Sequence, residues 1–123
     1  MKTIYSKEFF LLIIIVLILV PPVCFAENIV WINYRESPVN LDAGYFDYQN
    51  TDVSSWIRGV WYDTKSEYLI INLNGTYYHY CGVPQSIWLK YKDYNKHESF
   101  GRAHNTYLKG KYDCRKGYVP EYN

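Results

Sequence analysis

Apolar and aromatic residues gather into short runs in the central part of the chain, a pattern typical of β-strands. These runs predict strands over residues 57–62, 68–73 and 76–81, with a further candidate strand over residues 29–32. Gly59 interrupts the first central run and is a candidate β-bulge. Residues 63–66 predict one turn. Asn74 and Gly75 predict a tight hairpin, because a type I′ turn needs positive φ at both central positions.

The hairpin turn also fixes which side chains share a face of the sheet. A two-residue turn places Leu69 opposite Tyr80 and Ile71 opposite Tyr78. Because side chains alternate along a strand, the more apolar face carries Leu69, Ile71, Leu73, Tyr78 and Tyr80. The other face carries Tyr68, Ile70, Tyr77, His79 and Cys81. We expect helices to cover the first face.

The chain after the hairpin has the spacing of two amphipathic helices. Pro84 suits a first helical turn, and residues 85–91 predict the first helix. Residues 99–109 predict the second helix, which Gly110 would end. The side chains expected to face inward are Ile87, Trp88, Tyr91, Phe100, Ala103, Tyr107 and Leu108. The predicted fold is α+β: a small antiparallel sheet of three or four strands, followed by two helices packed on one face.

The N-terminal segment has the order of a secretory signal peptide. Lys2 and Lys7 precede an apolar run over residues 9–20, and Cys24-Phe25-Ala26 ends the segment. A helix over this run is about 18 Å long, whereas the hydrocarbon core of a membrane is about 30 Å thick. We therefore predict cleavage after Ala26, export to the periplasm or the medium, and no retained membrane span. An uncleaved membrane anchor is the alternative.

The chain that remains after cleavage, residues 27–123, has the length of one globular domain. It keeps two cysteines, Cys81 and Cys114. Exported proteins fold in an oxidising compartment, so an even number of cysteines favours one disulfide between them. Two unpaired thiols, buried as small apolar groups, are the alternative.

Composition and charge add a candidate binding surface. Aromatic residues make up 20% of the chain, and 15 of them are tyrosines. Residues 27–80 hold three basic and seven acidic groups, whereas residues 81–123 hold eight basic and four acidic groups. Basic residues interleaved with tyrosines are typical of surfaces that bind RNA or another anionic polymer, with Arg102, Lys109 and Lys111 as candidates. A solvated surface without a ligand is the alternative.

An ordered series of residues between 53 and 112 resembles the KTSC domain, which is named for a C-terminal segment of some lysyl-tRNA synthetases. The series consists of Ser54-Ser55, Tyr62-Asp63, Leu69, Gly75, Tyr78-His79-Tyr80, Val83-Pro84, Ser99, Gly101, Asn105 and Tyr112. Four segments are similar to a secreted branch of the family: Tyr34-Arg35, Pro38-Val39, Tyr78-His79-Tyr80-Cys81 and Asp113-Cys114-Arg115. His104 departs from the family, which commonly has an aromatic residue at that position.

The signal-peptide pattern and the resemblance together predict a division of the chain into four parts. These are a signal peptide (1–26), an N-terminal extension (27–52), a KTSC-like domain (53–116) and a C-terminal tail (117–123). The family has no established activity, so the resemblance supplies no catalytic residues. RNA binding has been suggested for it.

Tyr78 and Tyr80 are candidate ligand-binding residues. Rings placed two apart in a strand form a stacking platform for bases or sugars. The alternative is a pair of core tyrosines whose hydroxyls find partners at the edge of the helical layer.

His79 and Cys81 also lie two apart in the expected strand, which is the basis of a second alternative, a small Cys/His hydrolase of the cell envelope. Such an enzyme needs a free thiolate beside a base, whereas export favours an oxidised Cys81. His79, His97, His104 and Cys81 show none of the common zinc spacings, so we expect exposed histidines and no metal or cofactor. The interpretation we favour is a non-catalytic binding module of unknown ligand, with an anionic polymer or an envelope protein as candidate partners.

Overall fold

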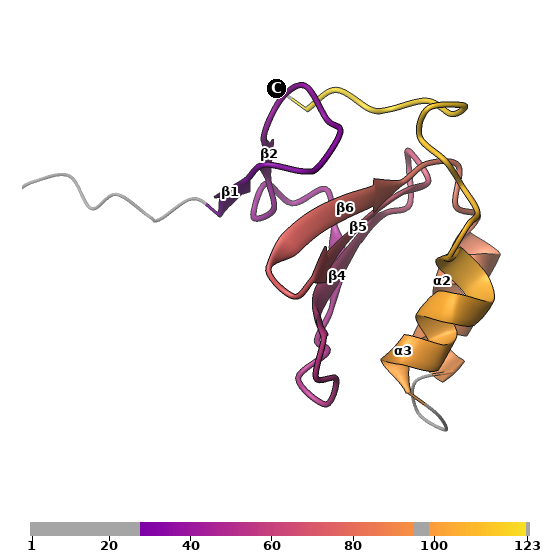
Figure 1. Ribbon diagram of the computed structural model, residues 1–123. Helices are drawn as coiled ribbons and strands as arrows, with labels where there is room; N and C mark the ends of the chain where they lie inside the picture. The colour runs from indigo at the N-terminus through magenta and orange to yellow at the C-terminus, as the bar shows by residue number, and fades with distance from the viewer. Residues whose placement is uncertain (1–27, 95–98, 123) are drawn as a thin grey trace, which may run out of the picture.

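A computed structural model describes residues 28–94 and 99–122 of the protein, and the predicted signal segment lies outside these residues. A four-stranded antiparallel sheet in the order β3-β4-β5-β6 occupies the centre (Figure 1). Its strands are β3 (Asp47–Gln49), β4 (Ile57–Asp63), β5 (Tyr68–Leu73) and β6 (Thr76–Tyr80). Two short strands, β1 (Ile29–Val30) and β2 (Val39–Asn40), pair separately. The α+β class is confirmed.

The predicted hairpin and its register are confirmed. Leu69 lies opposite Tyr80 and Ile71 opposite Tyr78 in the β5–β6 ladder. Asn74 and Gly75 have φ values of 54° and 97°, as the tight turn requires. The predicted bulge in β4 is also confirmed, because the register shifts between Ile57 and Val60. Gly59 within it has a φ of 141°, and a Cβ there would lie 2.5 Å from the Trp61 ring.

Helices cover the more apolar face of the sheet, as predicted. Helix α2 (Gln85–Tyr94) and helix α3 (Phe100–Ala103) lie on the same side of the strands (Figure 1). Their apolar side chains and those of the sheet form one core of fully buried residues: Ile57, Val60, Tyr62, Leu69, Ile71, Val83, Trp88, Tyr91, Phe100, Ala103 and Leu108. Tyr78 and Tyr80 pack at the margin of this core.

The second predicted helix is shorter and differently wound than expected. Ser99 caps helix α3, because its hydroxyl accepts a hydrogen bond from the backbone N–H of Arg102 at 3.2 Å. A π-helical turn, η1 (His104–Leu108), follows directly, and the N–H of Lys109 closes it on the carbonyl of His104 at 2.9 Å. Gly110 then leaves the helix with a φ of 75°.

The expectation of exposed histidines is wrong for His104, which is only 5% exposed. Its ring packs edge-on against Trp56 and Tyr80, at the position where the resemblance leads us to expect an aromatic side chain. An imidazole is flat and nearly as large as a benzene ring, so it fills the same space in the core. His79 is half-buried, and His97 lies outside the described residues.

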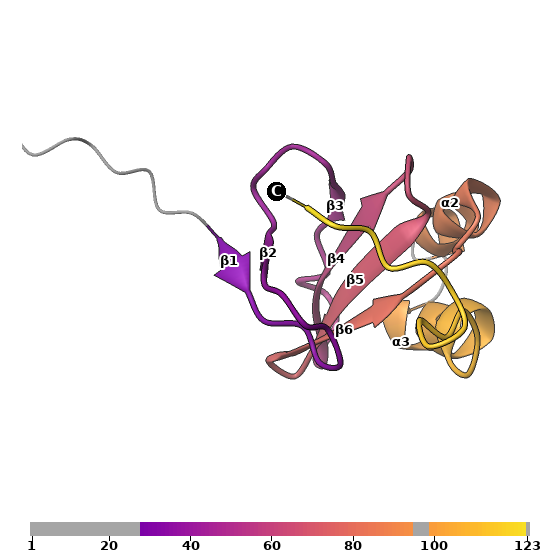
Figure 2. The ribbon, with the colours of Figure 1, turned by 90° about the horizontal axis from the view of Figure 1, so that it is seen from above.

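The second face of the sheet is buried as well, by segments from both ends of the described chain. Residues 28–46 and the C-terminal residues lie over this face, on the side away from the helices (Figure 2). The fully or nearly buried members of this second core are Val30, Ile32, Val39, Leu41, Trp61, Tyr68, Ile70 and Cys81. The segments before and after the sheet therefore form part of the folded core and are not appended tails.

A disulfide joins Cys81 to Cys114, with 4.8 Å between the Cα atoms. It fixes the chain after η1 beside the end of β6. The predicted pairing is thus confirmed, and two free thiols are excluded. Within the described residues, no helix has both the length and the apolar character needed to cross a membrane.

Candidate functional site

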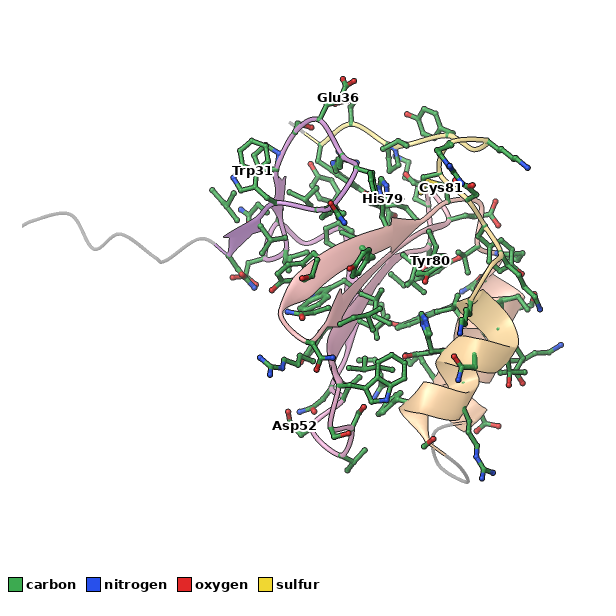
Figure 3. All side chains as sticks on the ribbon, viewed as in Figure 1. Trp31, Glu36, Asp52, His79, Tyr80 and Cys81 are labelled. Atoms are coloured by element: carbon green, nitrogen blue, oxygen red, sulfur yellow. A yellow bond between two sulfur atoms is a disulfide. The ribbon has the colours of Figure 1, made fainter. Side chains whose placement is uncertain are left out.

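A cleft of about 670 Å³ lies beside β6, which is one edge of the four-stranded sheet. Its walls come from β6, from the turn after β1 and from the segment that follows η1. The side chains that matter chemically are those of Tyr34, Tyr78, His79, Tyr80, Lys111 and Arg115. Figure 3 shows His79 and Tyr80 leaving opposite sides of β6, His79 toward the C-terminal segment and Tyr80 toward the helices.

Two other segments pair with β6, one at each end, and leave its middle open. The N–H of Asn33 donates to the carbonyl of Tyr77 at 2.8 Å, and the N–H of Cys81 donates to the carbonyl of Tyr112 at 2.9 Å. Tyr34 and Tyr112 both have left-handed backbones, with φ values of 67° and 57°. A left-handed residue turns the chain sharply, so both segments leave the strand where their pairing ends.

The open position is the backbone of His79. In an antiparallel ladder, the N–H and C=O of every second residue point to the same edge. Tyr77 and Cys81 point outward, as their bonds to Asn33 and Tyr112 show, so His79 between them points outward too. Within residues 28–94 and 99–122, its N–H and C=O have no partner.

Tyr78 and Tyr80 belong to the core margin and to the cleft at the same time. Both rings are half-buried and pack against the core under the helices. Neither hydroxyl has a hydrogen-bond partner among the described residues. The alternative in which both hydroxyls bond to groups at the edge of the helical layer is therefore not observed in this part of the chain. Burial raises the pKa of Tyr80, with a smaller contribution from the neighbouring Tyr78 hydroxyl. The Tyr80 hydroxyl is therefore a protonated donor at neutral pH.

A chain of hydrogen bonds runs through the second core to the cleft. The Arg35 guanidinium donates to the Tyr68 hydroxyl at 3.2 Å, and that hydroxyl lies 2.7 Å from Nδ1 of His79. The Tyr68 oxygen accepts from Arg35, so its single proton is available for Nδ1. We assign the proton of the neutral His79 ring to Nε2 on this basis, and the described residues provide no partner for that nitrogen.

The surroundings of His79 favour this neutral form. Burial lowers the pKa of His79, and the positive charge of Arg35 lowers it further, while Asp113 acts weakly in the opposite direction. His79 at neutral pH is thus an uncharged ring with a donor at Nε2.

Arg35 is a buried cation without a carboxylate partner. Its side chain is 9% exposed, and no acidic group lies within ion-pair distance of it in the described part of the chain. It donates instead to the carbonyls of Ser37 and Pro120, at 3.0 and 2.7 Å. The rings of Tyr68 and Tyr122 flank the guanidinium at 5.5 and 5.6 Å.

The structure brings some of the sequence-predicted residues together and separates others. Tyr78, Tyr80 and Lys111 share the cleft, and the Lys111 ammonium also donates to the Thr106 carbonyl at 3.1 Å. Lys109, which directly follows η1, and Arg102 on α3 are exposed and do not line the cleft. Sequence analysis missed Arg35 and Tyr68 as site residues, because their positions differ by 33 and no local pattern reveals the contact.

The cysteine and metal hypotheses have separate outcomes. Cys81 is bonded to Cys114, so it has no thiolate and the proposed Cys/His hydrolase lacks its nucleophile. No group of three or more His, Cys, Asp or Glu side chains within residues 28–94 and 99–122 is arranged to hold a metal ion.

Residues 53–112 match the family model of the KTSC domain. The chain carries a KTSC domain. No curated protein and no solved structure matches it. The KTSC domain contains β4, β5, β6 and both helices, and it supplies Tyr78, His79, Tyr80 and Lys111 to the cleft. Tyr34, Arg35 and Arg115 come from outside the KTSC segment, so the cleft depends on both flanking segments.

Proposed function

We propose that this KTSC-domain protein is a non-catalytic binding module whose ligand occupies the cleft beside β6. The observation that carries the proposal is the group of unpartnered polar atoms in one cleft. These are the backbone N–H and C=O of His79, its Nε2, and the hydroxyls of Tyr78 and Tyr80. Half-buried polar groups without protein partners are satisfied by water or by a ligand.

The chemistry of the cleft supports binding rather than catalysis. The disulfide removes the cysteine nucleophile, and burial raises the pKa of Tyr80 and so weakens its hydroxyl as a nucleophile. His79 is already engaged at Nδ1 by Tyr68. A base–nucleophile pair, which hydrolytic chemistry requires, is not formed by these side chains.

We also propose that the protein works outside the cytoplasm, after removal of residues 1–26. The order of basic, apolar and small residues in that segment supports export. The Cys81–Cys114 disulfide supports it too, because disulfides persist in oxidising compartments.

Mapping of amide chemical shifts tests the binding site. Residues 27–123, labelled with ¹⁵N, would be titrated with a neutral disaccharide, a sulfated disaccharide and short blocked peptides. The proposal expects saturable shifts centred on His79, Tyr80 and Lys111 with at least one probe. Tyr78→Phe, which keeps the ring and removes one hydroxyl, should weaken that binding. Shifts confined to another surface, or none with any probe, would contradict the proposal.

A further inference from the structure

We propose that the ligand of the β6 cleft is an extended peptide segment that pairs with the backbone of His79 and places an acidic side chain beside the His79 ring. This inference rests on the proposed function and names the class of ligand. Three features of the described residues carry it: the open edge of β6, the positive charge around the cleft, and the donor that Arg35 and Tyr68 set on His79.

The open strand edge favours a peptide. An extended backbone offers one N–H and one C=O to the same side at every second residue, which is what the outward N–H and C=O of His79 require. Asn33 and Tyr112 already pair with β6 on either side of this position. Between them the edge accommodates about three residues of added strand, since a strand rises about 3.3 Å per residue.

The register of such a strand determines which ligand side chains meet which protein side chains. A residue directly opposite another in a ladder shares its face of the sheet. The peptide residue opposite His79 therefore lies beside the His79 ring. The peptide residues before and after it lie on the opposite face, beside Tyr78 and Tyr80. Apolar or β-branched residues suit those two positions.

The charges around the cleft favour an acid at the central position. Arg115 holds Asp113 in a bidentate ion pair, in which Nη2 donates to Oδ2 at 2.7 Å and Nε donates to Oδ1 at 3.1 Å, so the charge of Asp113 is offset. Among the described residues, the Lys111 ammonium donates to the Thr106 carbonyl and forms no ion pair. Arg35 lies behind the cleft, and Asp63 accepts from Tyr122 at 2.6 Å rather than pairing with Arg35. The charges without an ionic partner around the cleft are then those of Lys111 and Arg35, and both are positive.

The chain of hydrogen bonds transmits the effect of the Arg35 charge to the Nε2 donor of His79. Arg35 donates to Tyr68, Tyr68 donates to His79, and His79 is left with a donor at Nε2. Each bond in such a chain polarises the next, so the positive charge of Arg35 strengthens the final donor. A carboxylate is the side-chain group of peptides that accepts such a bond best.

A matched pair of peptides tests the proposal on the chain from residue 27 to residue 123. The first is a blocked pentapeptide of sequence Gly-Val-Glu-Val-Gly, and the second has Gln in place of Glu. In low salt, the Glu peptide should bind about tenfold more tightly, the ratio expected for one charge-assisted hydrogen bond. Both peptides should shift the amide of His79, because backbone pairing is common to them.

Two lysine variants separate the cleft from general charge. Lys111→Gln should lower the preference for Glu over Gln by more than about twofold, because it removes a positive charge that lines the cleft. Lys109→Gln, which removes an equal charge outside the cleft, should leave that preference within about twofold. Tyr68→Phe should also lower the preference, because it cuts the chain between Arg35 and His79. Its ¹⁵N spectrum would show whether the fold is retained.

The outcomes distinguish this inference from the proposed function. Equal affinity for the Glu and Gln peptides would overturn the acidic specificity. Binding of the sulfated disaccharide at the cleft, with no binding of either peptide, would overturn the peptide and leave the binding module in place. Absence of shifts at the cleft with every probe would contradict both.

Discussion

The hydroxyl of Tyr68 lies 2.7 Å from Nδ1 of His79. Tyr68 is fully buried in the second core, whereas His79 lines the cleft beside β6. This contact therefore connects the part of the fold built by the N-terminal segment to the candidate binding site in the KTSC domain. Arg35, on the far side of Tyr68, completes the connection.

Tyr68→Phe tests this connection. The substitution keeps the ring but leaves one donor of the buried Arg35 without an acceptor, so we expect the free energy of unfolding to fall by about 1–3 kcal/mol. It also removes the group that fixes the proton of His79 on Nε2. Urea denaturation measures the first effect, and ¹⁵N spectra of the imidazole measure the second. Tyr122→Phe, which cuts only the bond to Asp63, is the control and should leave the His79 tautomer unchanged.

Stability should fall as the pH drops below the ordinary histidine range. Burial lowers the pKa of His104, and the charge of Lys109 lowers it further. The unfolded chain takes up a proton near pH 6.5, whereas folded His104 resists it. Stability from this group is therefore complete above that pH and is lost as the pH falls through it.

His104→Phe isolates this group. It replaces the imidazole with an aromatic ring of similar size and removes a buried Nδ1 that has no partner among the described residues, so stability at pH 7 should rise by about 1–3 kcal/mol. Denaturation curves between pH 5 and pH 8 should also show a smaller loss at acid pH. Unchanged pH dependence in the variant would mean that His104 does not resist protonation.

The disulfide should supply a large part of the stability. Its two cysteines are separated by 33 residues, for which chain entropy gives roughly 3–4 kcal/mol. Cys81→Ser with Cys114→Ser should lower the melting temperature and loosen the segment after η1. Peptide mapping without reducing agent checks the bond itself, and two alkylatable thiols in the native protein would refute it.

Gly59→Ala should be more harmful than an ordinary Gly→Ala change. Its φ of 141° is unfavourable for any side chain, and the added Cβ would lie 2.5 Å from the Trp61 ring. We expect a loss of more than about 2 kcal/mol. Gly44→Ala is the matched control, because Gly44 also has a positive φ, of 87°, but its Cβ would meet no atom within 4 Å. Equal losses would show that the ring contact does not matter.

Local sequence signals predicted the hairpin and the helix-covered face, but not the second core. The register follows from Asn74-Gly75 alone, and the exposed or buried side of each strand follows from alternation. The contacts that build the second core join residues far apart, such as Arg35 with Pro120 and Tyr122 with Asp63. No periodic pattern in a single sequence reports such pairs.

The candidate site could be predicted only in part, because it too depends on contacts between residues far apart in the sequence. Tyr78 and Tyr80 were identified from their strand and the family pattern, and Lys111 from the basic segment. The sequence does not distinguish Lys111 from Lys109, because both are exposed lysines near the end of the second helix. Only the path of the chain after Gly110 brings one of them to the cleft.

Hydrogen exchange at the amide of His79 tests the central claim most directly. In the free protein, this amide should exchange much faster than those of Tyr78 and Tyr80, which point toward β5 in the ladder. Addition of saturating Gly-Val-Glu-Val-Gly peptide should slow exchange at His79 while leaving its neighbours unchanged. An amide of His79 that is already protected in the free protein, or that exchanges at the same rate with and without the peptide, would contradict an open strand edge that binds a ligand.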